Sequence, residues 1–205
     1  MSQKLNKYLT KVIPDRHPVL MEMEQYAREK RFPIVGPLVG RFLYQMTVTA
    51  RARRILELGS GFGYSAFWFS LATRGKGYIT MTDSDKLNKR RAFEYFKKAG
   101  LQSQFDFKIG KALNVIKKMS GTFDLILNDI DKDGYPETID PAARFLKKGG
   151  LFITDNAFWS GGVLEKKPDK TSRAIIDFTE SLYRDSRFFT TIVPIRDGLC
   201  VAVRL

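Results

Sequence analysis

Short apolar runs of strand length alternate with amphipathic segments along most of this chain. The segments between the first five runs have apolar residues at helical spacing, at 64–73, 85–100, 111–120 and 135–149. Apolar strands that are each followed by a helix are typical of a parallel sheet covered on both faces. The pattern therefore predicts a doubly wound α/β fold with a mainly parallel sheet, whose strands are RRILEL, GYITMTD, FDFKI, FDLILND, GLFITD, FTTIVPI and GLCVAVRL.

Glycines and basic residues indicate where these elements end. Lys98-Ala-Gly100 and Lys148-Gly-Gly150 each combine a basic last turn with glycine, which predicts a helix end before the next strand. Only RDG (196–198) separates the last two runs. We therefore expect a hairpin and an antiparallel last strand.

The chain length suits a single domain. Its 205 residues can bury a sizeable core, and we divide them into an N-terminal helical segment (1–50) and a core (51–205). The charged start has no apolar stretch of signal-peptide length, and no segment is long enough to span a membrane. We therefore expect a cytoplasmic protein with no membrane partner.

Two residue types occur once each. Cys200 lies in an apolar run, so we expect a buried structural thiol. His17 is the sole histidine, and we interpret it as a surface residue without a catalytic role.

The charge balance is unusual, because 35 Lys and Arg against 22 Asp and Glu give a net charge of +13. Such an excess favours RNA or acidic small substrates through long-range attraction. Solvated helix and turn surfaces are an equally good interpretation, since the basic residues are spread over 51–54, 86–91, 97–98, 117–118, 147–148 and 165–167.

A glycine turn follows the first strand. Gly59, Gly61 and Gly63 alternate directly after RILEL, and glycines at this position let the backbone approach a ligand at the carboxyl end of a strand. A dinucleotide fingerprint needs a further glycine at position 64, which is Tyr. Glu57 would also repel a pyrophosphate and attract a cation. These features favour S-adenosylmethionine, which carries an ammonium and a sulfonium and no phosphate.

The second strand ends in Asp83, about twenty residues after the turn, where an acid accepts hydrogen bonds from ribose hydroxyls. Together with Glu57, it strengthens the prediction of a nucleoside cofactor.

Carboxylates and an amide follow the fourth and fifth strands. Because parallel strands end at one edge of the sheet, we expect Asp129, Asp155 and Asn156 to converge beside the cofactor. Asp129 is expected to contact both the cofactor and a metal ion. Such oxygen donors suit Mg²⁺, although Mn²⁺ and Ca²⁺ stay open. Asp131 and Asp133 are interpreted as solvated loop charges.

Lys132 lies in the loop that leaves the fourth strand. A dication nearby disfavours the charged form of a lysine, so Lys132 can act as a base towards an acceptor hydroxyl. These residues together predict methyl transfer to oxygen.

The chain resembles the metal-dependent O-methyltransferases of the catechol and caffeoyl-CoA type, in their bacterial branch. The resemblance runs from about residue 20 to the C-terminus. It implies a Rossmann-like class I methyltransferase fold with a seven-stranded sheet, and a homodimer. The motifs that carry it are LELGSGFGYSA, the acid that ends the second strand, KAGL, NDIDKDGY, GGLFITDNAFWSGGV and RDGL.

The same resemblance implies roles for individual residues. Those that match cofactor contacts are Glu57, Gly59, Gly61, Ser65 and Asp83; the implied metal ligands are Asp129, Asp155 and Asn156; the implied base is Lys132. The chain departs from the family at Lys111, where relatives often carry an acid near the adenine. We therefore expect the adenine to contact the backbone or Ala112.

Several functions stay open. The first is methylation of a catechol-like or phenolic small molecule, with Phe158 and Trp159 either against its ring or packed under their loop. The second is methylation of 5-hydroxyuridine in a tRNA anticodon, because residues 24–37 resemble the start of such enzymes and the charge suits RNA. A non-catalytic protein that binds S-adenosylmethionine is a more distant alternative, and the glycine spacing disfavours a nicotinamide dehydrogenase.

Overall fold

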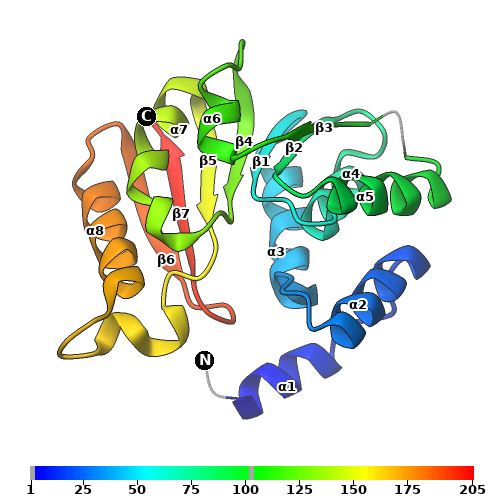
Figure 1. The fold of residues 1–205 in the computed structure, drawn as a ribbon, viewed down its shortest axis with the longest axis horizontal. Coiled ribbons are helices and arrows are strands. Elements are labelled where there is room, and N and C mark those ends of the chain that lie inside the picture. Colours follow the sequence, from blue (N-terminus) through cyan, green and yellow to red (C-terminus); the bar gives the residue numbers. More distant parts are fainter. Residues whose placement is uncertain (1–2, 102–103) are drawn as a thin grey trace.

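A single seven-stranded sheet runs through the molecule (Figure 1). The computed structural model describes residues 3–101 and 104–205. The strand order is β3-β2-β1-β4-β5-β7-β6. The bounds of the strands are β1 Arg54–Leu58, β2 Tyr78–Asp83, β3 Phe105–Ile109, β4 Phe123–Asn128, β5 Leu146–Thr154, β6 Phe188–Val193 and β7 Leu199–Arg204.

The strand directions confirm the predicted mainly parallel sheet with an antiparallel last strand. Strands β1 to β5 pair in parallel, whereas β7 is antiparallel to both β5 and β6. The chain builds outward from β1 to β3 and then returns to place β4 on the other side of β1. This reversal is a topological switch point, where ligands bind in open α/β sheets.

Helices cover both faces of the sheet (Figure 1). Alternate residues of each strand point to opposite faces; Ile55 joins the core under α2 to α5, and Leu56 joins the core under α6 to α8. The helix bounds are α1 Gln3–Lys11, α2 Pro18–Lys30, α3 Gly36–Thr49, α4 Tyr64–Thr73, α5 Lys86–Lys98, α6 Ala112–Ile116, α7 Ile139–Phe145 and α8 Lys170–Arg184, with short 3₁₀ helices η1 Lys132–Gly134, η2 Pro136–Thr138 and η3 Trp159–Leu164.

From residue 3 onward the N-terminal segment is helical, as predicted, and forms α1, α2 and α3; residues 1–2 of the predicted segment lie outside the described residues. The interpretation of His17 as a surface residue is wrong, because its half-buried ring packs 5.3 Å from Phe67 and its Nδ1 accepts a hydrogen bond from the Val19 N–H at the start of α2. Within the described ranges, no helix has the length and apolar character needed to cross a membrane.

Two predicted helix ends have different outcomes. The first is confirmed, since α5 ends at Lys98 and Gly100 has a φ of +69°. The second is wrong: α7 ends at Phe145, and Lys148, Gly149 and Gly150 lie in β5. Backbone pairing of Leu146 with Phe123 begins the strand early, with a register irregularity before Leu125, so sheet pairing overrides the local helical pattern.

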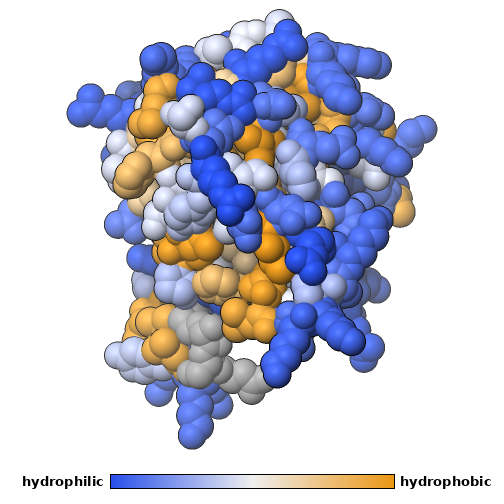
Figure 2. Space-filling model, turned by 90° about the vertical axis from the view of Figure 1, so that its left-hand side faces the viewer, coloured by the Kyte–Doolittle hydropathy of each residue, from blue (hydrophilic) through white to orange (hydrophobic). Residues whose placement is uncertain are grey.

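The outer surface beyond α8 and β6 is mixed in character (Figure 2). Hydrophilic side chains cover much of this face, and apolar side chains lie between them. Phe189 of β6 is 69% exposed and Tyr183 of α8 is 50% exposed. Cys200 is buried in β7, as expected for a structural thiol.

Candidate active site at the carboxyl edge of the sheet

The glycine turn and the loop after β4 touch at the switch point. Gly59 has a φ of +81°, and a Cβ there would lie 2.4 Å from the carbonyl oxygen of Asp129. The Asp129 N–H donates to the Leu58 carbonyl at 2.8 Å. Only glycine allows this approach, so the two loops that carry the predicted cofactor and metal residues are held side by side.

Glu57 lies at the end of β1, completely buried. The Ser65 hydroxyl donates to its Oε1, whereas its Oε2 has no hydrogen-bond partner within the described chain. Burial raises the pKa of Glu57 to about 8, against the effect of the Ser65 hydrogen bond. An unpartnered carboxylate oxygen here is suited to a cationic ligand.

Asp83 and Ala112 lie at neighbouring strand ends. One Asp83 oxygen accepts a hydrogen bond from the Gly61 N–H at 3.0 Å, which ties β2 to the glycine turn. The Gly110 N–H donates to the Asp83 carbonyl at 3.0 Å, and Ala112 is buried at the start of α6. Lys111 is exposed between them.

Two carboxylates face the edge from β4 and β5. Asp155 is 4% exposed and Asp129 is half-buried. Burial and then the charge of Asp129 raise the pKa of Asp155 to about 7. Burial also raises the pKa of Asp129, although Lys132 opposes this shift. The mutual repulsion of the two carboxylates is relieved by a cation.

Asn156 follows Asp155 with a left-handed φ of +58°, a region that asparagine tolerates. Its amide nitrogen donates to Asp197 Oδ2 at 3.1 Å, which leaves the amide oxygen as a ligand atom. Across residues 3–101 and 104–205, no three His, Cys, Asp or Glu side chains gather as a metal site. A cation at this edge would therefore need Asn156 beside the two carboxylates.

Lys132 begins η1 and points back to the site. Its Nζ donates to Asp129 Oδ1 at 2.9 Å and to the Ile130 carbonyl at 3.2 Å. The same atom lies 5.5 Å from the ring centre of Tyr135 and 5.9 Å from that of Trp159. The lysine therefore lies beside the carboxylate pair, against aromatic rings.

The remaining predicted residues are two aromatic residues of the loop after β5 and two acids of the loop after β4. Trp159 faces Lys132, whereas Phe158 packs on the hairpin: a Cβ at Gly198 would lie 2.7 Å from its ring.

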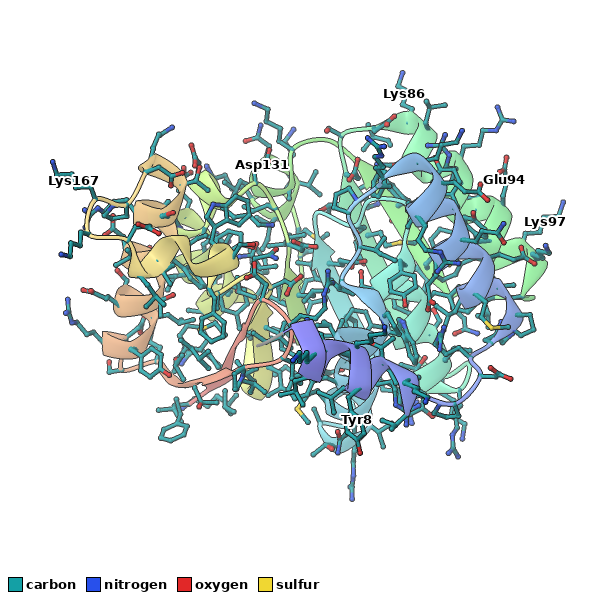
Figure 3. The ribbon with its side chains drawn as sticks, turned by 90° about the horizontal axis from the view of Figure 1, so that it is seen from below. Tyr8, Lys86, Glu94, Lys97, Asp131 and Lys167 are labelled. Atoms are coloured by element: carbon teal, nitrogen blue, oxygen red, sulfur yellow. The ribbon has the colours of Figure 1, made fainter. Side chains whose placement is uncertain are left out.

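Asp131 is exposed and points away from the site (Figure 3). Exposed Asp133 binds Lys170 and Thr171 of α8. The interpretation of both acids as solvated loop charges agrees with this geometry.

Sequence reasoning missed three residues that support the edge. Tyr135 is fully buried, and its hydroxyl donates to the Asp155 carbonyl at 2.9 Å. Asp197 accepts the Asn156 amide and also the Ser160 N–H at 2.6 Å. Arg196 donates to the Ile34 carbonyl at 2.8 Å. The sequence RDG signalled a turn, and only the fold shows that this turn reaches the site.

A buried polar group connects the N-terminal segment to the glycine turn. Arg16 binds Glu24 of α2 through two hydrogen bonds of 2.8 Å each. The Tyr64 hydroxyl donates to Glu24 at 2.8 Å. Tyr64 is the residue that stands where a dinucleotide fingerprint has glycine, and here it fastens α2 to the start of α4.

Comparison with known proteins agrees with this fold. The model of a family described as O-methyltransferase matches residues 11–205. A caffeoyl-CoA O-methyltransferase of Medicago sativa is 28% identical, with 100% of this chain and 90% of that protein aligned. A catechol O-methyltransferase of Niastella koreensis is 29% identical over 80% of this chain and 77% of its own. The crystal structure of the SAH-bound methyltransferase PaMTH1 of Podospora anserina has a TM-score of 0.88 and 25% identity, and the alignment covers 98% of this chain and 94% of that one.

Proposed function

The chain belongs to the O-methyltransferase family and is an S-adenosylmethionine-dependent O-methyltransferase, and from this premise we propose its metal and its acceptor. It uses a divalent cation, for which Mg²⁺ is the first candidate, and it methylates a hydroxyl of a catechol-like or phenolic small molecule. The names of the caffeoyl-CoA and catechol O-methyltransferases that it resembles support this acceptor class.

The carboxylate pair carries the metal proposal. Asp129 and Asp155 are close enough that the charge of one raises the pKa of the other, and they lie where β4 and β5 end beside the glycine turn. With the Asn156 oxygen, they form the all-oxygen donor set that Mg²⁺ prefers. When bound, the cation would orient the oxygens of the acceptor, and S-adenosylmethionine would supply an electrophilic methyl group.

The residues of this chain fit the cofactor. Glu57 offers the ammonium of the methionine part a buried oxygen that has no hydrogen-bond partner among the described residues. Asp83 lies at the adjoining strand end to accept ribose hydroxyls, and Ala112 begins the helix beyond it. In this proposal Gly59, Gly61, Gly63 and Ser65 form the turn around the ligand, and Asp129 lies between cofactor and metal.

Lys132 is the proposed base. Its amine lies against Asp129 and the ring of Trp159, and in this proposal it takes the proton of the acceptor hydroxyl. Holding the two reactants in line contributes on the order of 7–11 kcal/mol to such a step.

A tRNA wobble uridine is the second candidate acceptor. The net charge of +13 favours it, because a basic rim with stacking aromatic rings binds single-stranded RNA. Trp159 would then be a platform for a base rather than the wall of a small pocket.

The test is methyl transfer from labelled S-adenosylmethionine, with and without EDTA, to a catechol panel and to tRNA that lacks wobble-uridine methylation. We expect EDTA-sensitive label in a catechol, and loss of that label in Asp155→Asn with cofactor binding retained. Label that survives EDTA would refute the metal, and label in tRNA alone would favour the second candidate. Binding of neither S-adenosylmethionine nor Mg²⁺ would indicate a non-catalytic protein.

Two further expectations stay predictions. Homodimer formation is checked by light scattering of the purified protein. The cytoplasmic location is checked by cell fractionation.

A further inference from the structure

A groove of about 600 Å³ lies between α1, the segment that joins α2 to α3, and Arg196 of the β6–β7 hairpin. Seen from below, the start of α1 lies beside the tip of this hairpin, and Tyr8 points outward from α1 (Figure 3). Ile34, Pro37 and Leu38 form the apolar part of the wall. Arg196 precedes Asp197, which binds Asn156 at the carboxyl edge of the sheet, so the groove adjoins the candidate active site.

The charged side chains that line the groove are all cations. Lys7 and Lys11 lie one helical turn apart on α1, and Arg196 faces them from the hairpin. Within residues 3–101 and 104–205, none of the three forms an ion pair with an acid of the chain. Like charges one turn apart repel each other, so a bound anion would stabilise this arrangement.

Arg196 connects the groove to the candidate active site. Its guanidinium donates to the carbonyls of Ile34 and Val35, which fixes the side chain without neutralising its charge. Burial raises the pKa of both Asp129 and Asp155, and the charge of Arg196 partly opposes this rise. The same side chain thus borders the groove on one side and influences the carboxylate pair on the other.

Asn6 and Thr10 of α1 add polar side chains to the groove. A ligand here would meet an apolar wall, these two polar groups and three cations. These features match a small amphiphilic molecule with an anionic end.

We propose that this groove binds a carboxylate or phosphate group carried by the methyl acceptor, with the apolar body of the acceptor against Ile34, Pro37 and Leu38. The inference rests on the proposed methyl transfer to a catechol-like small molecule, and it specifies that this acceptor is an acid. Lys7 and Lys11 then determine acceptor specificity and do not take part in the chemical step.

The experiment compares 3,4-dihydroxybenzoate with its uncharged methyl ester, which presents the same two hydroxyls. Calorimetry measures the affinity of each for the full chain in the presence of S-adenosylhomocysteine and MgCl₂. We expect the acid to bind about tenfold more tightly than the ester, as two partly exposed ion pairs allow. Lys7→Gln/Lys11→Gln should reduce the affinity of the acid to that of the ester and leave the ester unchanged.

Control variants separate the charge from the fold of α1. Lys4→Gln lies on the same helix outside the groove and should bind both compounds as the wild type does. Lys7→Arg/Lys11→Arg should retain the preference for the acid. Inorganic phosphate should compete with the acid and not with the ester.

The remaining outcomes overturn the proposal or the function on which it rests. Equal affinity of acid and ester in the wild type, or binding of neither, would refute the groove assignment. If phosphate binding depends on both lysines while acid and ester bind equally, the lysines bind an anion that is not part of the acceptor. This outcome would also refute the groove assignment. Tight binding of the acid through the lysines without methylation of either compound would refute the proposed function and leave the groove assignment standing.

Discussion

At the scale of single residues, the burial of Glu57 determines whether its carboxyl carries a proton before the cofactor binds. Its pKa of about 8 means that the unliganded protein holds this carboxyl mostly protonated at pH 7. A bound ammonium favours the charged carboxylate. We therefore expect S-adenosylmethionine binding at pH 7 to release up to one proton, measured by calorimetry in buffers of different ionisation enthalpy.

Two controls accompany the proton measurement. Methylthioadenosine, which lacks the ammonium, should bind without this release. Glu57→Gln should bind S-adenosylmethionine more weakly and also without it. Equal proton release with both ligands in the wild type would contradict the role of Glu57.

Glu57 also gives the unliganded protein a pH-dependent stability. Its folded pKa of about 8 lies above the ordinary value of 4.5, so the folded state holds the extra proton between these values. This stabilisation is complete below pH 4.5 and is lost as pH rises through 8, with a slope of at most about 1.4 kcal/mol per pH unit. Urea unfolding of wild type and Glu57→Gln from pH 5 to 9 should show the wild type losing stability relative to the variant; parallel curves would contradict the shift.

Substitutions of Lys132 can distinguish a positioning role from a role in proton transfer. Lys132→Arg keeps a cation beside Asp129, but an arginine does not give up its proton. We expect both Lys132→Arg and Lys132→Ala to reduce kcat by about 10²–10⁴ and to bind S-adenosylmethionine as the wild type does. Lys170→Ala, which removes an exposed pair with Asp133, is the matched control. Near-normal turnover in Lys132→Arg would indicate a positioning role only.

The residues of this edge differ in how far sequence predicts them. Each of four acids lies within one residue of a strand end, so the parallel sheet brings them together: Glu57, Asp83, Asp129 and Asp155. Arg196 contacts Ile34 across 162 positions of the chain, and no local pattern indicates such a contact. The catalytic and binding roles of the site residues stay predictions.

At the scale of elements, the Arg16–Glu24–Tyr64 group fastens α2 to the start of α4. Arg16→Met would leave Glu24 buried without its cation, which we expect to lower the free energy of unfolding by about 3–5 kcal/mol. Tyr64→Phe removes one hydrogen bond and should cost only about 1 kcal/mol. Urea unfolding measures both changes.

A surface pair provides the control for this group. Arg90 and Glu94 pair on the exposed side of α5, so Arg90→Met should change stability by less than about 1 kcal/mol. If Arg16→Met behaved like Arg90→Met, the buried group would not be what fastens α2.

Element boundaries show where local pattern fails. The helix predicted at 64–73 matches α4, but it is buried on nearly all sides rather than amphipathic, because it packs between the sheet and α3. The pattern at 111–120 gives only Ala112–Ile116 as helix. The region 146–150 joins β5 because Leu146 already pairs with Phe123 of β4, before the regular pairing from Leu151 onward. Local periodicity predicts where an element lies, and pairing across the sheet decides where it ends.

At the scale of the whole molecule, the sequence predicted the sheet and its strand directions. Apolar strands joined by helices have few arrangements open to them, since parallel crossovers are right-handed and consecutive strands are usually neighbours. The placement of α1 beside the hairpin was not predictable, because α1 follows no strand and its position depends on contacts distant in sequence. The organisation as a single domain stays a prediction.

The net charge of +13 gives a test of whether RNA is a substrate or an incidental ligand. Exposed lysines occur as adjacent pairs at separate places along the chain, such as 117–118 and 166–167. Lys167 points away from the molecule near η3 (Figure 3). For a small-molecule enzyme we expect RNA binding to reflect this diffuse charge. Its log affinity should then fall with log salt by roughly 0.7 per phosphate contacted.

Charge reversal at the two sites distinguishes the candidates. Lys117→Glu/Lys118→Glu and Lys166→Glu/Lys167→Glu change the net charge equally, so a diffuse field should weaken binding of a labelled anticodon stem-loop equally in both. Fluorescence anisotropy between 50 and 200 mM KCl provides the affinities and slopes. A loss confined to the 166–167 variant would mean that the RNA enters beside Trp159, because that pair follows η3 directly. In that case the wobble uridine, and not a catechol, would be the acceptor that this charge serves.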